Sequence, residues 1–156
     1  MSASLDDVVK AVRDTLLPLN DNFNFYSEER TSETITAGEK RKIIKSGGER
    51  GWFIGLLCRC DSNLLRVVLR ANTFNGMEEK EATASELYTR GLVNPNVYSF
   101  WLSRYDTGND EYTIMYTPSP WLPYTKGYYV YVENTGSSSC TLHRFRVLRA
   151  KLAEET

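Results

Sequence analysis

The chain contains one histidine, so a triad-type hydrolase would have to use His143 as its base. His143 lies in the run LHRFRV, among alternating residues typical of a strand and beside Arg144 and Arg146. No nucleophile motif such as G-x-S-x-G occurs in the sequence. The pattern favours a surface or edge-strand histidine, and we expect no enzymatic activity. A hydrolase that uses His143 or a carboxylate pair is the weakest alternative.

Three cysteines and this histidine supply four atoms of the kind that bind zinc: Cys58, Cys60, Cys140 and His143. However, the spacing C-x-C differs from the C-x-x-C of zinc knuckles, and Cys58 and Cys60 lie in the most apolar run of the chain. Two cysteines this close on one strand rarely bridge each other, although either could meet Cys140. The odd count favours free, reduced and buried thiols, and we expect no metal and no cofactor.

The carboxylates suggest no specific site either. The loop that contains Asp106, Asn109 and Asp110 lacks the ligand order of an EF-hand. A glycosidase needs two carboxylates at a fixed separation, and candidates such as Asp106 and Glu133 fall on separate segments. We therefore interpret the acidic loop as a solvated hairpin.

Aromatic side chains offer a carbohydrate site, because sugar rings stack on Trp and Tyr. The ligand-binding candidates are four aromatic residues of the C-terminal half: Trp101, Tyr105, Trp121 and Tyr124. Tyr129 and Tyr131 are also available. At strand spacing, however, such residues are more often core and cross-strand partners, which is the interpretation we favour.

Basic residues cluster locally although the net charge is only −1, from 19 basic and 20 acidic residues. The clusters are Lys40, Arg41, Lys42 and Lys45, then Arg144, Arg146 and Arg149, and finally Arg66 and Arg70. No nucleic-acid-binding motif accompanies them. Solvated faces or salt bridges between subunits explain them better than nucleic acid does.

The elements that must position these residues fall into two parts. Residues 4–17 predict an amphipathic helix that ends at Pro18, with one apolar stripe formed by Leu5, Val8, Val9, Val12 and Leu16. This stripe is our candidate for contacts between subunits. Residues 19–34 are polar, so we assign residues 1–34 to a helix with an arm and residues 35–152 to a β-sandwich domain.

Alternating apolar residues and turn signals predict strands across the second part. The expected strands span residues 42–44, 52–60, 64–71, 98–105, 112–117, 127–134 and 140–152, with a loop over 72–82. A short helix is expected over 83–91, where Thr83 and Glu86 have the spacing of a capping box. The expected core comprises Trp52, Ile54, Leu56, Val67, Leu69, Ile114, Val130 and Val132. This is the pattern of a mainly-β, jelly-roll-like antiparallel sandwich with an N-terminal helix and one short inserted helix.

Length and composition agree with one globular domain of 156 residues. Acidic residues stand near Met1 where a signal peptide would be basic, and no run approaches the ~20 apolar residues of a membrane span. The sequence therefore predicts neither a secretory signal nor a membrane helix.

Four stretches in order carry a resemblance to a known class of proteins: TAGEKRKIIKSGGERGWFIGLLCRCDSNLLRVVLR, ASELYTRGLVNPN, FWLSRYDTGNDEYTIMYTPSPWLPY and YVYVENTGSSSCTLHRFRV. Over residues 35–150 the chain resembles the small jelly-roll or β-sandwich domains of virion structural proteins in tailed phages and archaeal viruses. The resemblance implies a capsid decoration protein, a minor capsid protein or a tail component, made in the host cytoplasm and placed in the virion.

The same resemblance implies that the partners are other virion subunits, in a symmetric homo-oligomer for which we expect a trimer. It assigns no binding site to any residue. The competing hypothesis is a carbohydrate-binding module for attachment to a host surface.

Overall fold

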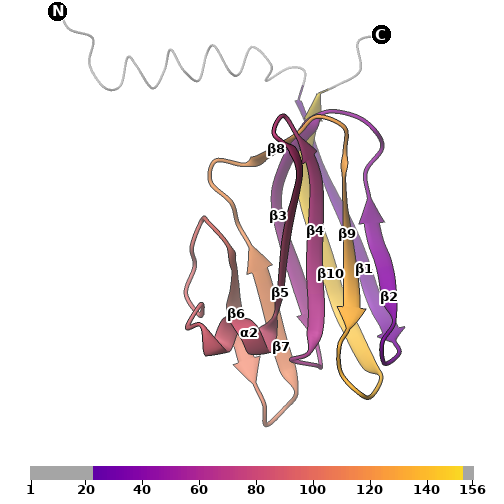
Figure 1. Cartoon of the computed structure of the whole chain (residues 1–156), viewed down its shortest axis with the longest axis vertical. Helices are drawn as coiled ribbons and strands as arrows, with labels where there is room; N and C mark the ends of the chain where they lie inside the picture. The colour runs from indigo at the N-terminus through magenta and orange to yellow at the C-terminus, as the bar shows by residue number, and fades with distance from the viewer. Residues whose placement is uncertain (1–22, 153–156) are drawn as a thin grey trace, which may run out of the picture.

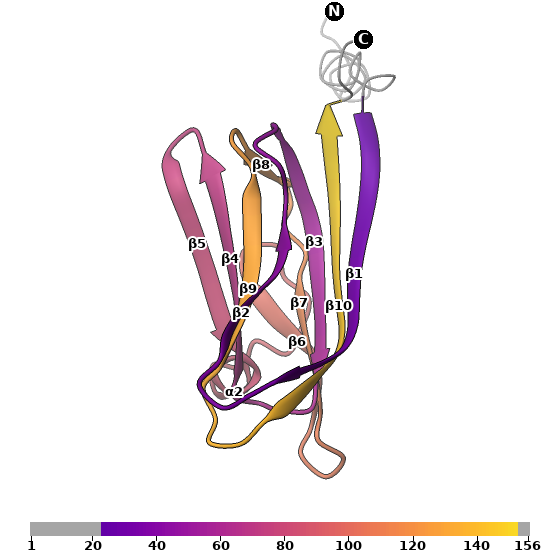
Figure 2. The same ribbon diagram turned by 90° about the vertical axis from the view of Figure 1, so that its right-hand side faces the viewer.

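The computed structural model describes residues 23–152, which form two antiparallel sheets packed face to face (Figure 2). The elements of this range are β1 (Phe23–Ile35), β2 (Lys40–Lys45), β3 (Gly51–Cys60), β4 (Leu65–Thr73), β5 (Gly76–Thr83), α2 (Ala84–Thr89), β6 (Phe100–Asp106), β7 (Glu111–Tyr116), β8 (Leu122–Tyr124), β9 (Tyr128–Asn134) and β10 (Cys140–Leu152). The predicted mainly-β, sandwich-like fold with a short inserted helix is confirmed. The predicted helix over residues 4–17 and its five apolar residues lie outside the described residues.

The strand order shows how the chain moves between the two layers. Sheet A has the order β1-β10-β3-β7-β6, and sheet B has the order β2-β9-β4-β5. The short strand β8 also belongs to sheet A, where it pairs with the first residues of β3 while β7 pairs with the last ones. β1 starts beside the end of β10, so the described part of the chain begins and ends at the same end of the sandwich, opposite α2 (Figure 1). Strands distant in sequence are therefore neighbours in both sheets.

The core lies between the sheets. Six of the eight residues expected there are at most 3% exposed: Leu56, Val67, Leu69, Ile114, Val130 and Val132. The prediction is wrong for Trp52 and Ile54, which are only partly buried, because Phe53 between them occupies the core. The apolar run of β3 could not fix which side faces inward, since both sides carry apolar residues.

Two segments that the sequence suggested to be irregular are edge strands. Residues 23–35 are not an arm but strand β1, which pairs with β10 along its whole length. Its polar composition reflects its place at the edge, where Glu29 accepts a 2.6 Å hydrogen bond from Arg144. Likewise, most of the expected loop over 72–82 is strand β5, the exposed edge of sheet B.

The short helix α2 begins as the sequence predicted. The Thr83 side chain caps it by accepting a 3.1 Å hydrogen bond from the backbone N–H of Glu86. Within residues 23–152, no helix has the length and apolar character that crossing a membrane requires.

Candidate functional site

The four aromatic residues expected to bind sugar lie in separate places. Tyr124 is 1% exposed and belongs to the core, whereas Tyr105 stacks on Tyr88 with ring centroids 4.1 Å apart. Trp101 is half-buried on β6 and donates a 3.0 Å hydrogen bond to Thr117. Trp121 is 41% exposed in the connection before β8. The structure brings no two of them into one sugar-binding constellation.

The residues considered for catalysis do not converge either. His143 is half-buried on β10, and no hydrogen bond or ion pair to it is found within residues 23–152. Arg149 is 9% exposed and forms ion pairs with Glu28 at 3.0 Å and Glu49 at 2.6 Å. This cluster neutralises a buried cation and includes no nucleophile, so its role is structural.

The three cysteines are free and buried. Burial raises the pKa of the Cys140 thiol to about 12. The hydrogen bond with Cys60, together with burial, holds the pKa of Cys58 well above its ordinary value. Neither residue is a thiolate near neutral pH, and within the described range no three His, Cys, Asp or Glu side chains are grouped as metal ligands.

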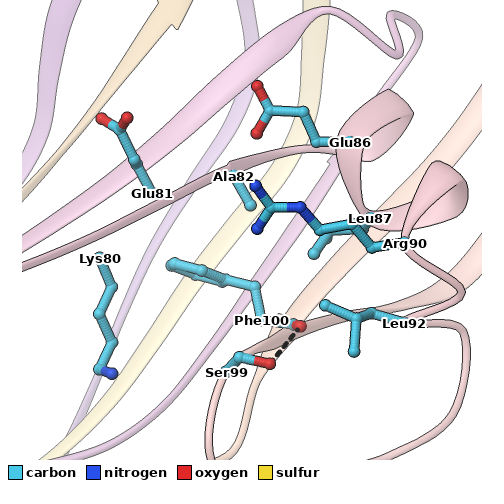
Figure 3. A pocket seen from close by; sticks show the side chains of 9 residues that line it. All are labelled: Lys80, Glu81, Ala82, Glu86, Leu87, Arg90, Leu92, Ser99 and Phe100. Carbon is cyan, nitrogen blue, oxygen red and sulfur yellow. Dashed lines mark hydrogen bonds between the residues drawn. The ribbon is translucent and has the colours of Figure 1, made fainter.

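A small pocket opens between β5, α2 and β6 (Figure 3). It encloses about 160 Å³ and is lined by Lys80, Glu81, Ala82, Glu86, Leu87, Arg90, Leu92, Ser99 and Phe100. Its floor is apolar and its rim is charged, and the Ser99 hydroxyl donates to the Phe100 carbonyl at 3.1 Å. The volume is below that of ordinary small-molecule sites.

Apolar side chains also gather on the side of sheet A that faces away from the core. Trp101 of β6 pairs with Met115 of β7, Met115 pairs with Leu57 of β3, and all three are half-buried while their chain neighbours fill the core. Because side chains alternate along a strand, these three form one outward-facing row across the sheet.

A second row lies nearer the chain ends. Trp52 of β3 pairs with Ala150 of β10, which in turn pairs with Phe25 of β1. Phe25 is 65% exposed and contacts Trp121 edge-to-face with ring centroids 6.1 Å apart. Trp121 and Trp52 also line the same open hollow. The row is therefore aromatic over most of its width.

Between the rows, Leu148 of β10 is 38% exposed. We call this surface the apolar outer face; it comprises Phe25, Trp52, Leu57, Trp101, Met115, Trp121 and Leu148. Towards α2 the same side of the sheet becomes charged, with Arg104 and Glu111 in an ion pair of 2.8 Å. Arg146 of β10, which pairs with Leu57 and donates a 2.9 Å hydrogen bond to Ser27, interrupts the apolar residues on the β1 side. A cluster of exposed apolar side chains bordered by polar ones is typical of a protein-binding site.

The outward side of sheet B is built differently. Tyr129 and Tyr131 are stacked, with ring centroids 6.1 Å apart. The ammonium groups of Lys42 and Lys40 lie 4.6 and 4.5 Å from the ring centroids of Tyr129 and Tyr131, respectively. Arg70 donates a 2.7 Å hydrogen bond to the Tyr129 hydroxyl and is ion-paired with Glu79. Because cations cover the rings, they are not open platforms for a sugar or a base.

Sequence reasoning selected Trp101 and Trp121 singly but missed the surface to which they belong. A signal was present in the run GWFIGLL, since a strand apolar on both sides needs cover on both sides. No model of a known protein family matches the chain, and no curated protein matches it.

Proposed function

We propose that this chain is a non-enzymatic virion structural protein, a capsid decoration protein, minor capsid protein or tail component, that binds other virion subunits as a symmetric oligomer. The observation that carries the proposal is the apolar outer face. It offers Phe25 of β1, Leu148 of β10 and Trp121 of the connection before β8 at 65, 38 and 41% exposure. A surface of this kind gains free energy when a partner removes it from water.

The order of the strands supports a jelly roll. In both sheets, strands from the start of the chain alternate with strands from its end. One sheet contains the order β1-β10-β3-β7, and the other has the order β2-β9-β4-β5. That is the order expected of an eight-stranded double-sheet jelly roll, with β6 and β8 as additions. Jelly rolls recur in viral capsid and lectin domains, which makes a virion role and a glycan-binding role the natural competitors.

The apolar outer face also suggests a role for the N-terminal stripe of Leu5, Val8, Val9, Val12 and Leu16. β1 begins at Phe23, two residues before Phe25 of that face. A helix over residues 4–17 would be about 21 Å long, close to the width of about 19 Å spanned by the five strands from β1 to β6. We propose that this stripe covers the apolar outer face of a neighbouring subunit.

The test compares two matched leucines by light scattering after size-exclusion chromatography of the full chain. Leu148→Asp puts a charge into the apolar outer face, whereas Leu64→Asp changes a leucine of similar exposure, 41 against 38%, in the turn before β4. We expect the unaltered chain and Leu64→Asp to form the same oligomer, and both Leu148→Asp and removal of residues 1–22 to reduce its mass.

A full chain that remains monomeric at every concentration would contradict the oligomer. A virion role further requires that the chain co-purifies with particles from its native source. Its absence from purified particles would contradict that role even if the oligomer forms.

One observation favours the second candidate, a glycan-binding module. The open hollow between Trp52 and Trp121 presents a partly exposed indole, the group that sugars stack on. Under this hypothesis Trp121→Ala abolishes binding on a glycan array while Trp121→Phe retains part of it, both with unchanged melting temperatures. No signal from the unaltered chain on a broad array would remove this candidate.

A further inference from the structure

The two edges of sheet B carry opposite charges. At one edge, β2 exposes the cations Lys40, Lys42 and Lys45. At the other, β5 exposes the carboxylates Glu78 and Glu81, and a third, Glu79, that is ion-paired with Arg70. Within residues 23–152, β2 pairs only with β9 and β5 only with β4. Each edge therefore offers unpaired backbone N–H and C=O groups along its outer side.

The register places one cation of β2 and one carboxylate of β5 on the same line of paired residues across sheet B. Lys42 pairs with Tyr131, Tyr131 with Val68, and Val68 with Glu81, across all four strands. Paired residues of antiparallel strands point to the same side of a sheet, so Lys42 and Glu81 both lie on the outward side. Within the described range neither has an ion-pair partner within 4.0 Å, although the Lys42 ammonium lies 4.6 Å from the centroid of the Tyr129 ring.

We propose that β2 of one copy pairs with β5 of the next, with Lys42 against Glu81, so that sheet B continues from copy to copy. This inference rests on the proposed function, whose symmetric oligomer it supplies with an interface. Because every neighbouring pair in sheet B is antiparallel, β2 and β5 run in opposite directions. A second copy in the same orientation therefore presents its β5 antiparallel to β2, and the strands match in length at 6 and 8 residues.

The charges also determine the polarity of the contact. Lysines on an edge strand ordinarily keep other strands away. Here two β2 edges repel each other, and so do two β5 edges, while β2 attracts β5. This combination rejects a two-fold contact between like edges and selects a head-to-tail contact, which closes into a ring when the rotation between successive copies divides a full turn.

A ring of this kind fits the proposed function. All copies have the same orientation, so their chain ends leave on one side and their apolar outer faces turn to the same radial side. That arrangement leaves the apolar outer face available to another virion subunit or to the N-terminal stripe of a neighbour.

Charge reversal and charge exchange test the pairing by light scattering on the full chain. Lys42→Glu and Glu81→Lys each place like charges at every contact, and we expect each to lower the oligomer mass. The double variant Lys42→Glu/Glu81→Lys restores opposite charges and should restore the mass. Arg30→Glu, which changes an exposed cation on β1 of sheet A, serves as the matched control and should leave the mass unchanged. Melting temperatures verify that all four variants fold.

The outcomes separate the two proposals. A monomeric unaltered chain overturns both. An oligomer that neither single charge reversal weakens overturns the edge pairing, and it leaves the proposed function standing with a different interface.

Engineered cysteines test the head-to-tail polarity, because the three native thiols are buried. We expect Lys42→Cys/Glu81→Cys to form disulfide-linked multimers under mild oxidation, while Lys42→Cys alone and Glu81→Cys alone form none. A single variant that links into dimers would show that like edges meet and would overturn the inference.

Discussion

Trp52 and Phe53 are consecutive residues on β3, yet their side chains lie on opposite sides of sheet A. Phe53 is fully buried and contacts Tyr128 of sheet B edge-to-face, with ring centroids 5.1 Å apart. Trp52 lies on the apolar outer face. Both are large and apolar, so their chemistry alone does not reveal which one fills the core; the pairing of β3 with its neighbours does.

Leu69 shows the opposite situation, since its strand alternates clearly and its place in the core could be predicted. We expect Leu69→Ala to reduce the free energy of unfolding by ~2–5 kcal/mol, because it removes buried methyl groups and leaves a cavity. Leu148→Ala, at a site 38% exposed, should cost less than about 1 kcal/mol. Urea denaturation of both variants measures the difference, and equal losses would mean that the inward side of β4 is misassigned.

The buried thiols give a second prediction at this scale. Because burial raises the pKa of Cys140 to about 12, this thiol stays protonated and shielded at pH 8. The hydrogen bond with Cys58 lowers the pKa of Cys60, but this thiol is also buried, as are the other two. Because the reagent cannot reach a buried thiol, Ellman's reagent should react with none of the three cysteines within minutes in the native protein, and with all of them in denaturant. Rapid reaction of one thiol in the folded protein would contradict the buried arrangement.

At the scale of elements, the edge strands β1 and β5 were missed by the sequence-based prediction, whereas the central strands β4 and β9 were predicted. β4 and β9 have neighbours on both sides, and most of their residues are buried. β1 and β5 are edges, and every residue of β5 before Lys80 is exposed. A solvated edge places few constraints on side chains, so its sequence resembles a loop even though its backbone forms a full ladder.

The turn from β4 to β5 depends on a glycine. Gly76 has φ of +100°, a conformation that side-chain-bearing residues rarely adopt. We expect Gly76→Ala to destabilise the protein by ~1–2 kcal/mol. Gly48→Ala is the control, because its φ is outside the left-handed region and nothing lies within 4 Å of the added methyl group. In thermal unfolding, Gly76→Ala should lower the melting temperature more than Gly48→Ala does. Equal melting temperatures would mean that the φ of Gly76 imposes no strain on a side chain.

At the scale of the whole molecule, aromatic rings join the two sheets. Tyr124 of sheet A packs on Tyr128 of sheet B with ring centroids 5.0 Å apart, and Phe53 contacts the same tyrosine. Tyr116 is 2% exposed. Burial raises the pKa of Tyr116 and that of Tyr124 to about 12. The packing of the sheets therefore requires neutral phenols.

This requirement predicts loss of stability at high pH. The folded-state pKa of about 12 exceeds the unfolded value of about 10. The contribution of these tyrosines is therefore complete below about pH 10 and lost as the pH rises through about 12. Urea midpoints between pH 9 and 11.5 should fall, and Tyr116→Phe should flatten the decline. An unchanged midpoint across this range would contradict the burial of the phenols.

The two surfaces that the proposals use were the least predictable part of the molecule. Trp101, Met115 and Leu57 come from three strands, and only the pairing of these strands makes them one row. The same is true of Lys42 and Glu81, which four strands place at one height. Such surfaces depend on contacts between distant segments, for which no local pattern exists.

The sequence by itself determined the class of structure, the short helix with its Thr83 cap, the central strands, and the inward side of β4 and β9. These features could be predicted because burial and capping act on neighbouring residues and leave periodic or short-range patterns in the sequence. The tertiary structure alone decided the inward side of β3, the edge strands β1 and β5, and the two surfaces that the proposals use. These depend on strand register and sheet order, which are fixed by pairing across the whole chain rather than by any local run of residues.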